Sequence, residues 1–184
     1  FVMVTTLYGD IPSQILVKAN KIKLFVCDID GVFSDGRIYL GNDGEELKAF
    51  HTKDGYGIKA LVNSGVDVAV ITGRNSNIVL QRMTALNVKH IIQGQENKLP
   101  VLKQLINSLE LSPEQIAYIG DDMPDFNCMD FVGFSIAVND AHPSILKIAD
   151  HTTSIKGGFG AVRESCDLIT QSQQTLQHAS GASI

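Results

Sequence analysis

Residues 22–31, with the sequence IKLFVCDIDG, decide the fold. The first six are almost all apolar, and two carboxylates, Asp28 and Asp30, follow at once. A short apolar run without polar alternation is typical of a strand covered on both faces, as in a parallel sheet. We therefore expect a buried strand at 22–27 that carries a pair of carboxylates at its carboxyl end.

Similar apolar runs alternate with helix-like segments along the rest of the chain. The runs at 66–71, 90–93, 116–119 and 133–138 indicate buried strands, and a shorter run follows at 151–154. Between them we expect helices at 56–64, 77–86, 98–109, 125–131 and 143–148, with a capped helical turn at 112–115. This alternation predicts an α/β fold, a doubly wound parallel sheet.

One segment, residues 36–50 (GRIYLGNDGEELKAF), departs from the alternation. Asn42, Asp43 and Gly44 tolerate positive φ and lie between two strand-like arms, so they predict a projecting β-hairpin. The apolar side chains of its arms are Ile38, Tyr39, Leu40, Leu47 and Phe50. Because an isolated two-stranded ribbon is marginal in water, we expect these side chains to be buried by assembly rather than by folding back on their own domain.

Length and composition describe one globular domain. The 184 residues fit a single unit over 1–184, with a core at about 21–170 and a polar tail at 171–184 whose last residues we expect to fray. The hydrophobic content of 44% is ordinary, and no apolar run reaches the roughly 18 residues of a membrane span. A net charge of −5 disfavours nucleic-acid binding, which requires a basic face.

The three cysteines and the first residues bear on the cellular compartment. Cys27, Cys128 and Cys166 form no paired motif, and we expect them to be reduced and structural. The first ten residues do not have the pattern of a secretory signal. We therefore expect a cytoplasmic protein without membrane or nucleic-acid partners.

Polar side chains follow several of the expected strands. Asp28 and Asp30 follow the first, Thr72 the second, and Asp121 and Asp122 the fourth, while Lys98 opens the helix after the third. Ligands of open α/β sheets bind outside the carboxyl ends of the strands, so these groups should share one rim. Thr72 and the backbone N–H groups after it would form an anion seat at a helix N-terminus. Isolated carboxylates often only cap helices, but four on one rim indicate a Mg²⁺ site.

A family resemblance joins these residues. Asp28-x-Asp30, Thr72, Lys98 and the run 120–125 (GDDMPD) resemble the four motifs of the haloacid dehalogenase superfamily, in that family's order. A closer resemblance, over about residues 21–170, is to its phosphatases for an eight-carbon sugar-acid 8-phosphate of lipopolysaccharide precursor biosynthesis. The runs that carry it are CDIDGVFSDGRIY, GEELKAFHTKDGYGIK, ITGRNS, QGQENK, YIGDDMPD, VNDAHP and GGFGAVRE.

The resemblance implies a role for each motif residue. Asp28 would be the nucleophile that forms an aspartyl-phosphate, and Asp30 would protonate the leaving oxygen and later activate water. Thr72 and Lys98 would bind the phosphoryl oxygens. Asp28, the backbone carbonyl of Asp30, and Asp121 would ligate Mg²⁺, with Asp122 and Asp125 supporting them from behind. Phosphoryl transfer depends on such positioning and charge neutralisation, and a carboxylate is already ionised at neutral pH.

The resemblance also implies how the substrate is enclosed. The intervals from Asp28 to Thr72 and from Lys98 to Asp121 hold no cap domain, so the lid must come from the hairpin, the C-terminal segment or another chain. The related enzymes are homotetramers, and the segment 157–164 would reach a neighbouring site; alternatively it is a glycine loop before a last helix. The further residues placed around the sugar acid are His51, Thr52, Lys53, Asp54, Gly55, Lys59, Gly73, Arg74, Arg82 and Arg163. Arg74 and Arg82 would share one helix face.

Three other functions are consistent with parts of the pattern. A phosphatase for a nine-carbon sugar-acid 9-phosphate would keep the same chemistry. A phosphoacceptor receiver domain has similar groups, but its acidic pair precedes the phosphoacceptor, whereas here Asp-x-Asp leads. A non-catalytic relative, like the domain fused to some sugar-acid cytidylyltransferases, is disfavoured by the intact motif residues.

Overall fold

A six-stranded parallel sheet forms the centre of the computed structural model, which describes residues 2–176. The strand order is β10-β9-β8-β3-β6-β7, and every pairing is parallel. The strands are β3 (Leu24–Cys27), β6 (Asp67–Ile71), β7 (His90–Ile92), β8 (Ile116–Gly120), β9 (Phe134–Ala137) and β10 (His151–Thr152). Each expected strand overlaps an observed one, so the predicted doubly wound sheet is confirmed.

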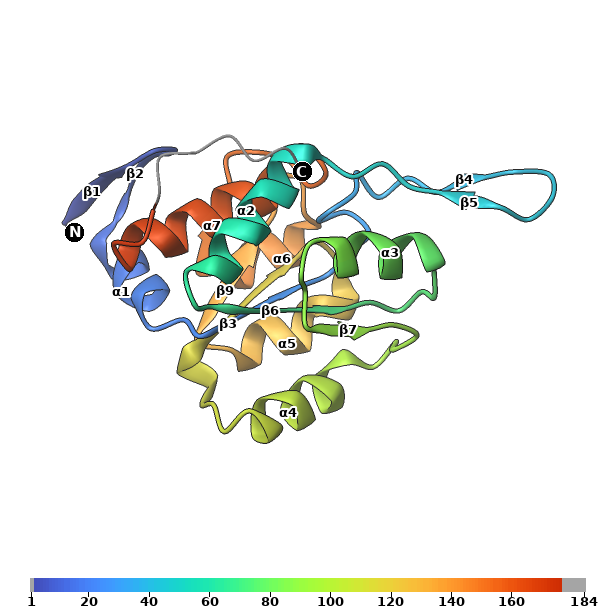
Figure 1. Cartoon of the computed structure of the whole chain (residues 1–184). Helices are drawn as coiled ribbons and strands as arrows, with labels where there is room; N and C mark the ends of the chain where they lie inside the picture. Colours follow the sequence, from blue (N-terminus) through green and yellow to red (C-terminus); the bar gives the residue numbers. More distant parts are fainter. Residues whose placement is uncertain (1, 177–184) are drawn as a thin grey trace.

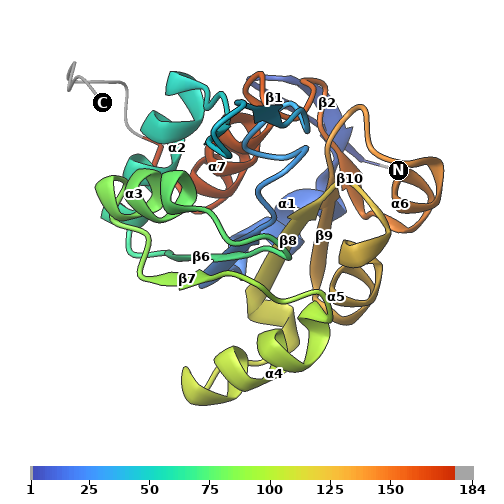
Figure 2. The same ribbon diagram turned by 90° about the vertical axis from the view of Figure 1, so that its right-hand side faces the viewer.

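Helices cover both faces of this sheet. They are α1 (Ser13–Asn20), α2 (Thr52–Asn63), α3 (Asn77–Ala85), α4 (Lys98–Ser108), α5 (Phe126–Phe131), α6 (Pro143–Ile148) and α7 (Ala161–Ser172). Figures 1 and 2 show α2, α3 and α7 on one face and α4 and α5 on the other. Helix α1 packs on α7, and α6 packs beside α5. The two-sided cover explains why the strands are continuously apolar.

The strand order reverses between β3 and β8. From β3 the chain proceeds to β6 and β7 on one side, and then crosses to β8, β9 and β10 on the other. In doubly wound sheets the crevice at such a switch point holds the ligand. The residues that follow β3 and β8, including Asp28 and Asp121, therefore meet at the natural binding position of the fold.

The core is built around β3 and β8, whose residues are buried along their whole length. Phe25 and Tyr118 are among the largest side chains that are fully enclosed. The three cysteines are free and buried, as a structural role requires. The capped turn before β8 is confirmed as a 3-10 turn, Pro113–Gln115, with a capping box between Ser112 and Gln115.

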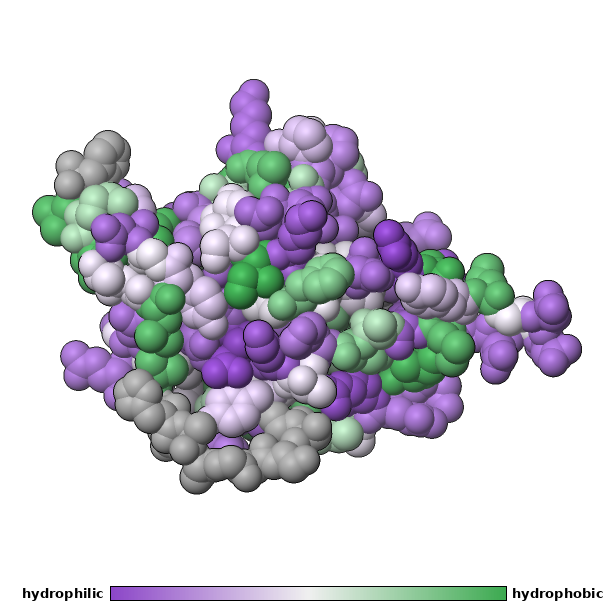
Figure 3. All heavy atoms as spheres, turned by 90° about the horizontal axis from the view of Figure 1, so that it is seen from above, coloured by the Kyte–Doolittle hydropathy of each residue, from purple (hydrophilic) through white to green (hydrophobic). Residues whose placement is uncertain are grey.

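The predicted hairpin is confirmed. Strands β4 (Tyr39–Leu40) and β5 (Glu46–Leu47) pair antiparallel and project from the end of the domain (Figure 1). Leu40 is 73% exposed and Leu47 is 56% exposed. Figure 3 shows green, hydrophobic side chains among hydrophilic ones at the end of the molecule where the hairpin projects. Phe50 differs from this, because it packs against the core of its own domain.

The first twenty residues form structure to which the sequence analysis assigned no role. Strands β1 (Met3–Thr6) and β2 (Gly9–Pro12) make an antiparallel hairpin that leads into α1. Ile11, Ile15 and Ala19 join the core. At the other end, α7 extends to Ser172, so part of the expected tail is helical, and its last eight residues, 177–184, lie outside the described residues. None of the helices in the described part is long and apolar enough to cross a membrane.

The segment 157–164 packs against its own domain and does not extend away from it. Gly157 lies so close to the backbone of Gly31 that a Cβ atom there would be 1.7 Å from the Gly31 oxygen. Gly158 N donates to Val32 O at 2.9 Å, and Val162 is buried in the core. Among these eight residues only Phe159, 56% exposed, belongs to the exposed class. The segment is the glycine loop before the last helix.

Candidate active site

A buried lysine joins two of the rim carboxylates. Lys98 is the first residue of α4, as expected, and is only 3% exposed. Its Nζ lies 2.8 Å from Asp28 Oδ1 and 2.9 Å from Asp125 Oδ1. These carboxylates raise the pKa of Lys98 to about 12 although burial alone would lower it. Lys98 is therefore a permanent positive charge at the floor of the site.

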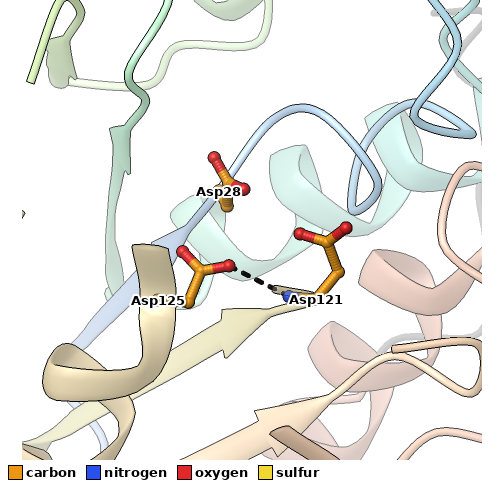
Figure 4. A group of neighbouring side chains, drawn as sticks. All are labelled: Asp28, Asp121 and Asp125. Carbon is orange, nitrogen blue, oxygen red and sulfur yellow. Dashed lines mark hydrogen bonds between the residues drawn. The ribbon is translucent and has the colours of Figure 1, made fainter. Parts of the chain in front are cut away.

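Asp125 organises the loop after β8. Its Oδ1 accepts from Tyr118 Oη at 2.6 Å, and its Oδ2 accepts from the backbone N–H groups of Asp121 and Asp122 at 3.0 and 3.4 Å. Figure 4 shows the bond to Asp121 and the carboxylates of Asp28, Asp121 and Asp125 grouped together. Since both oxygens of Asp125 have donors, its role is to hold Asp121 in place. Asp122 is exposed and caps the turn Met123–Asp125 through Met123 N.

The geometry and electrostatics of this carboxylate cluster favour a cation. Asp28, Asp121 and Asp125 each offer an oxygen within 4.8 Å of the others. Burial, together with repulsion between the carboxylates, raises the pKa of Asp28 to about 7 and that of Asp121 to about 8. A hard divalent cation such as Mg²⁺, which prefers one or two carboxylates with waters and substrate phosphate, removes that repulsion. The residues present therefore fit Mg²⁺.

A glycine allows the two strand ends to approach this closely. Gly31 has a φ of +87°, which L side chains rarely adopt. A Cβ atom at this position would lie 2.0 Å from Asp121 Oδ2. Any larger residue would push Asp121 away from Asp28, so the glycine after Asp30 sets the spacing of the cluster.

A cavity of roughly 550 Å³ opens above the cluster. That volume is in the range of small-molecule sites. It is lined by Asp28, Asp30, Gly36, Thr72, Gly73, Arg74, Glu96, Lys98, Asp121, Asp122 and Pro124. This lining has five carboxylates and two cationic side chains, so an anionic ligand would be repelled unless a metal cation accompanied it.

The hairpin contributes a second charged network at the edge of the cavity. Lys48 Nζ pairs with Asp30 Oδ1 and lies 3.2 Å from Glu46 Oε1. Arg74 Nη2 lies 3.4 Å from Glu46 Oε2. Asp30, Lys48, Glu46 and Arg74 therefore form a continuous chain of alternating charge from the strand end to the cavity wall.

Thr72 and Gly73 line the cavity, but not at a helix N-terminus. Helix α3 begins at Asn77 with Ser76 as its N-cap, so Thr72 lies on the loop before it. The expected anion seat at a helix N-terminus is therefore wrong for Thr72. Arg74 is on the same loop, so the expectation that it shares a helix face with Arg82 is also wrong. The loop 72–76 between β6 and α3 causes both differences, because it separates Thr72 and Arg74 from the helix.

The remaining sequence-predicted residues do not line the cavity of their own chain. They are His51, Thr52, Lys53, Asp54, Gly55, Lys59, Arg82 and Arg163. His51 caps α2, because its Nδ1 accepts from Lys53 N at 3.1 Å. Thr52 and Lys53 are exposed, whereas Lys59 and Arg82 are half-buried on α2 and α3.

Asp54 and Arg163 form a structural pair between α2 and α7. Arg163 N donates to Asp54 Oδ1 at 2.9 Å, and the Arg163 Nε donates to Asp167 at 3.0 Å. The guanidinium also lies over the ring of Tyr56, 4.5 Å from its centroid. Burial raises the pKa of Asp54 to about 6, against the opposing effects of Arg163 and Arg82. Within one chain, Arg163 is thus held away from the cavity.

Three residues near the site were missed by the sequence analysis. Tyr118 lies in an apolar strand, and a buried tyrosine hydroxyl needs a partner, which is a usable signal. Lys48 and Glu46 flank Leu47 on a strand, so the alternation places them on one face. Glu96 lines the cavity just before α4, and its position in the sequence has no distinguishing pattern.

Comparisons with known proteins agree with this geometry. The model of the family "haloacid dehalogenase-like hydrolase" matches residues 88–157. The chain is 50% identical to the 3-deoxy-D-manno-octulosonate 8-phosphate phosphatase KdsC of Yersinia pestis, over 98% of this chain and 97% of the relative. It is 49% identical to KdsC of Escherichia coli strain K12, over 97% and 95%. These matches extend beyond residues 21–170, to nearly the whole chain.

Solved structures of 3-deoxy-D-manno-octulosonate 8-phosphate phosphatases are also similar to this chain. A crystal structure of the Yersinia pestis phosphatase has a TM-score of 0.96 and covers 100% of this chain and 99% of its own, at 50% identity. The phosphatase from Moraxella catarrhalis, in complex with a magnesium ion, a phosphate ion and a KDO molecule, is 44% identical with a TM-score of 0.87. It covers 88% of this chain and 93% of its own.

Proposed function

We propose that this chain, which belongs to the haloacid dehalogenase-like hydrolases and within them to the 3-deoxy-D-manno-octulosonate 8-phosphate phosphatases, hydrolyses that sugar-acid phosphate. The products are the free sugar acid, a lipopolysaccharide precursor, and inorganic phosphate. The observation that carries the proposal is 50% identity over 98% of the chain, together with the carboxylate cluster of Asp28, Asp121 and Asp125 beneath a small-molecule cavity.

Asp28 is placed to act as the nucleophile. It follows β3, faces the cavity and is paired with Lys98. A carboxylate oxygen of Asp28 forms the new bond to phosphorus while the bond from phosphorus to the sugar oxygen breaks. Lys98 and the Thr72 hydroxyl hold the phosphoryl oxygens in line, which is the main requirement of phosphoryl transfer.

Asp30 acts first as a general acid and then as a general base. It lines the same cavity two residues after the nucleophile. In its protonated form it gives a proton to the departing sugar oxygen. The resulting carboxylate then takes a proton from the water that attacks the aspartyl-phosphate, which releases phosphate and regenerates Asp28.

Mg²⁺ is the cofactor. The Asp28 and Asp121 carboxylates and the backbone carbonyl of Asp30 would hold it, while Asp125 and Asp122 keep the loop of Asp121 in place. When bound, the cation neutralises the carboxylates and the phosphate and draws the substrate phosphate toward Asp28. The magnesium ion in the Moraxella catarrhalis structure supports this choice of metal.

The sugar acid lies above the phosphate in this proposal. Arg74 is the cavity residue best placed for the substrate carboxylate, because its guanidinium is exposed at the cavity wall. Gly73 offers backbone beside it. The other proposed contacts, which are His51 to Gly55, Lys59, Arg82 and Arg163, would need another copy of the chain or a change in conformation to reach the substrate.

We also propose that the chain is one catalytic domain that assembles as a cytoplasmic homotetramer through its hairpins. Tyr39, Leu40 and Leu47 are 49%, 73% and 56% exposed in the single chain. Burying such side chains typically stabilises a structure by about 1.5–3 kcal/mol each. Neighbouring hairpins would thereby cover the open side of the cavity, over which residues 2–176 form no cap domain.

Side-by-side turnover tests the proposed activity. Phosphate release from 3-deoxy-D-manno-octulosonate 8-phosphate and from a nine-carbon sugar-acid 9-phosphate is measured with Mg²⁺ and with a chelator. We expect the eight-carbon substrate to have the higher kcat/KM and the chelator to abolish turnover. A preference for the nine-carbon substrate would reassign the substrate, and full activity in chelator would contradict the metal site.

A further inference from the structure

Lys48 is a buried cation behind the carboxylate of Asp30. Its side chain is 0% exposed, although it belongs to the otherwise exposed hairpin. Lys48 pairs with Asp30 but is not among the residues that line the cavity. A lysine ammonium is rarely removed from water without paired carboxylates. Asp30 and Glu46 are those partners.

We propose that Lys48 is a positioning residue for Asp30, which holds the acid/base carboxylate in the orientation that proton transfer requires. This inference rests on the proposed function, because it takes Asp30 as the acid and base. Lys48 itself touches neither the phosphate nor the sugar.

The contacts of Asp30 support this role. Among the side-chain hydrogen bonds of the described residues, Asp30 has one partner, Lys48. Its side chain is 21% exposed, so without that partner the carboxylate could turn to solvent. Asp28, by contrast, is held by Lys98 in the buried floor. A misplacement of about 1 Å in a reacting group can reduce a rate about 10²-fold.

The hairpin supplies Lys48 by simple strand geometry. Successive side chains of an extended arm point to opposite sides, so Glu46 and Lys48 face the site while Leu47 faces outward. The structure agrees, because Leu47 is 56% exposed and Glu46 is 18% exposed at its side chain. The same arm therefore presents an apolar surface outside and the lysine inside. Fixing the hairpin also fixes Lys48, and through it Asp30.

The test replaces Lys48 with Met, which keeps most of the side-chain volume and removes the charge. We expect Lys48→Met to lower kcat for the sugar phosphate about 10²-fold with KM changed by less than about threefold. An aryl phosphate needs little leaving-group protonation, so it should still phosphorylate Asp28. Its phosphoenzyme should accumulate, because the following water attack needs Asp30. Acid quenching and intact mass measurement detect that phosphoryl group.

Three matched variants make the test decisive. Glu45→Gln removes an exposed charge from the same hairpin and should change kcat less than about fivefold. Lys48→Gln, which keeps a neutral donor, replaces the Met variant if that variant does not fold. Asp30→Asn should show the same accumulation as Lys48→Met.

The outcomes separate this inference from the proposed function. Equal losses on both substrates without phosphoenzyme would mean that Lys48 is only structural, and the positioning role would be wrong. Normal turnover by Lys48→Met beside an inactive Asp30→Asn would overturn the positioning role alone. Normal turnover by Asp30→Asn would overturn the role of Asp30 itself and the positioning role with it.

Discussion

The carboxylate cluster and the β4–β5 hairpin are built in opposite ways. In the cluster, Lys98 and Asp125 are almost fully buried and every oxygen of Asp125 has a donor. In the hairpin, Leu40 and Leu47 are mostly exposed and the two strands have two residues each. The cluster is complete within one chain, whereas the hairpin has a surface that one chain leaves uncovered.

This difference assigns the reaction to the carboxylate cluster and the enclosure of the substrate to the hairpin. Strand ends of a packed sheet hold side chains within the narrow tolerance that phosphoryl transfer needs. A projecting ribbon cannot supply that precision alone, but it can enclose a substrate once neighbouring chains support it. Lys48 connects the hairpin to Asp30, the proposed acid and base. Changes in the cluster and at Lys48 should therefore affect chemistry, and changes on the exposed side of the hairpin should mainly affect assembly and recognition.

The largest effect is expected at the nucleophile. Asp28→Asn should lower turnover by on the order of 10⁴-fold or more, because no aspartyl-phosphate can form. Folding should persist, since the change removes a charge from a repulsive group. Phosphate release and thermal unfolding measured on the same sample check both statements. Substantial turnover by this variant would remove Asp28 from its role.

Lys98→Met should damage both chemistry and stability. It leaves the buried carboxylates of Asp28 and Asp125 without their shared cation. Breaking a buried ion pair costs about 3–5 kcal/mol, part of which protonation of Asp28 would offset. We expect the free energy of unfolding to fall by about 3 kcal/mol and kcat by at least about 10²-fold. Urea denaturation measures the first quantity, and Lys103→Met on the same helix is a matched exposed control.

Metal removal should change how stability depends on pH. Burial and mutual repulsion raise the pKa of Asp28 to about 7 and of Asp121 to about 8, from 3.8. The folded metal-free enzyme then binds more protons than the unfolded chain between about pH 4 and 8, so its stability falls as pH rises through that window. Mg²⁺ should reverse the trend, because it binds the ionised carboxylates. Melting temperatures across this range, with Mg²⁺ and with chelator, test the sign.

The smallest chemical effect is expected on the exposed apolar side of the hairpin. Leu40→Glu places a charge on the exposed apolar arm and should dissociate the proposed tetramer, with little change in the stability of the single domain. Turnover of an aryl phosphate should change less than about threefold, while KM for the sugar phosphate rises about tenfold or more. Light scattering and both assays measure this split. A Leu40→Glu protein that stays tetrameric would move the interface elsewhere.

The sequence predicts the sheet and the cluster well because both follow from strong local patterns. The apolar run before Asp28 and the Gly120-Asp121-Asp122 run after β8 determine the strand ends, and parallel topology brings them together. The Asn-Asp-Gly turn likewise predicts the hairpin. Chemistry that depends on strand-end position is therefore visible in one sequence.

What the sequence does not predict depends on contacts across the fold. Nothing local shows that the loop after Thr72 is too long for a helix N-terminus, or that Gly157 packs on Gly31. The contact of Arg163 with Asp54 depends on how α2 and α7 pack, and no spacing in the sequence predicts it, whereas its pair with Asp167 follows from i,i+4 spacing on α7. The contact of Lys48 with Asp30 is another that the sequence does not predict, because the two residues are 18 positions apart.

Identification of the phosphorylated residue tests the central claim most directly. The enzyme is mixed with the sugar phosphate and Mg²⁺, quenched in acid within one turnover, digested and mapped by mass spectrometry. We predict one phosphoryl group on Asp28, absent when chelator replaces Mg²⁺. A phosphoryl group on another residue, or full single-turnover phosphate release without any covalent phosphoenzyme, would contradict the assignment of the chemistry to the carboxylate cluster.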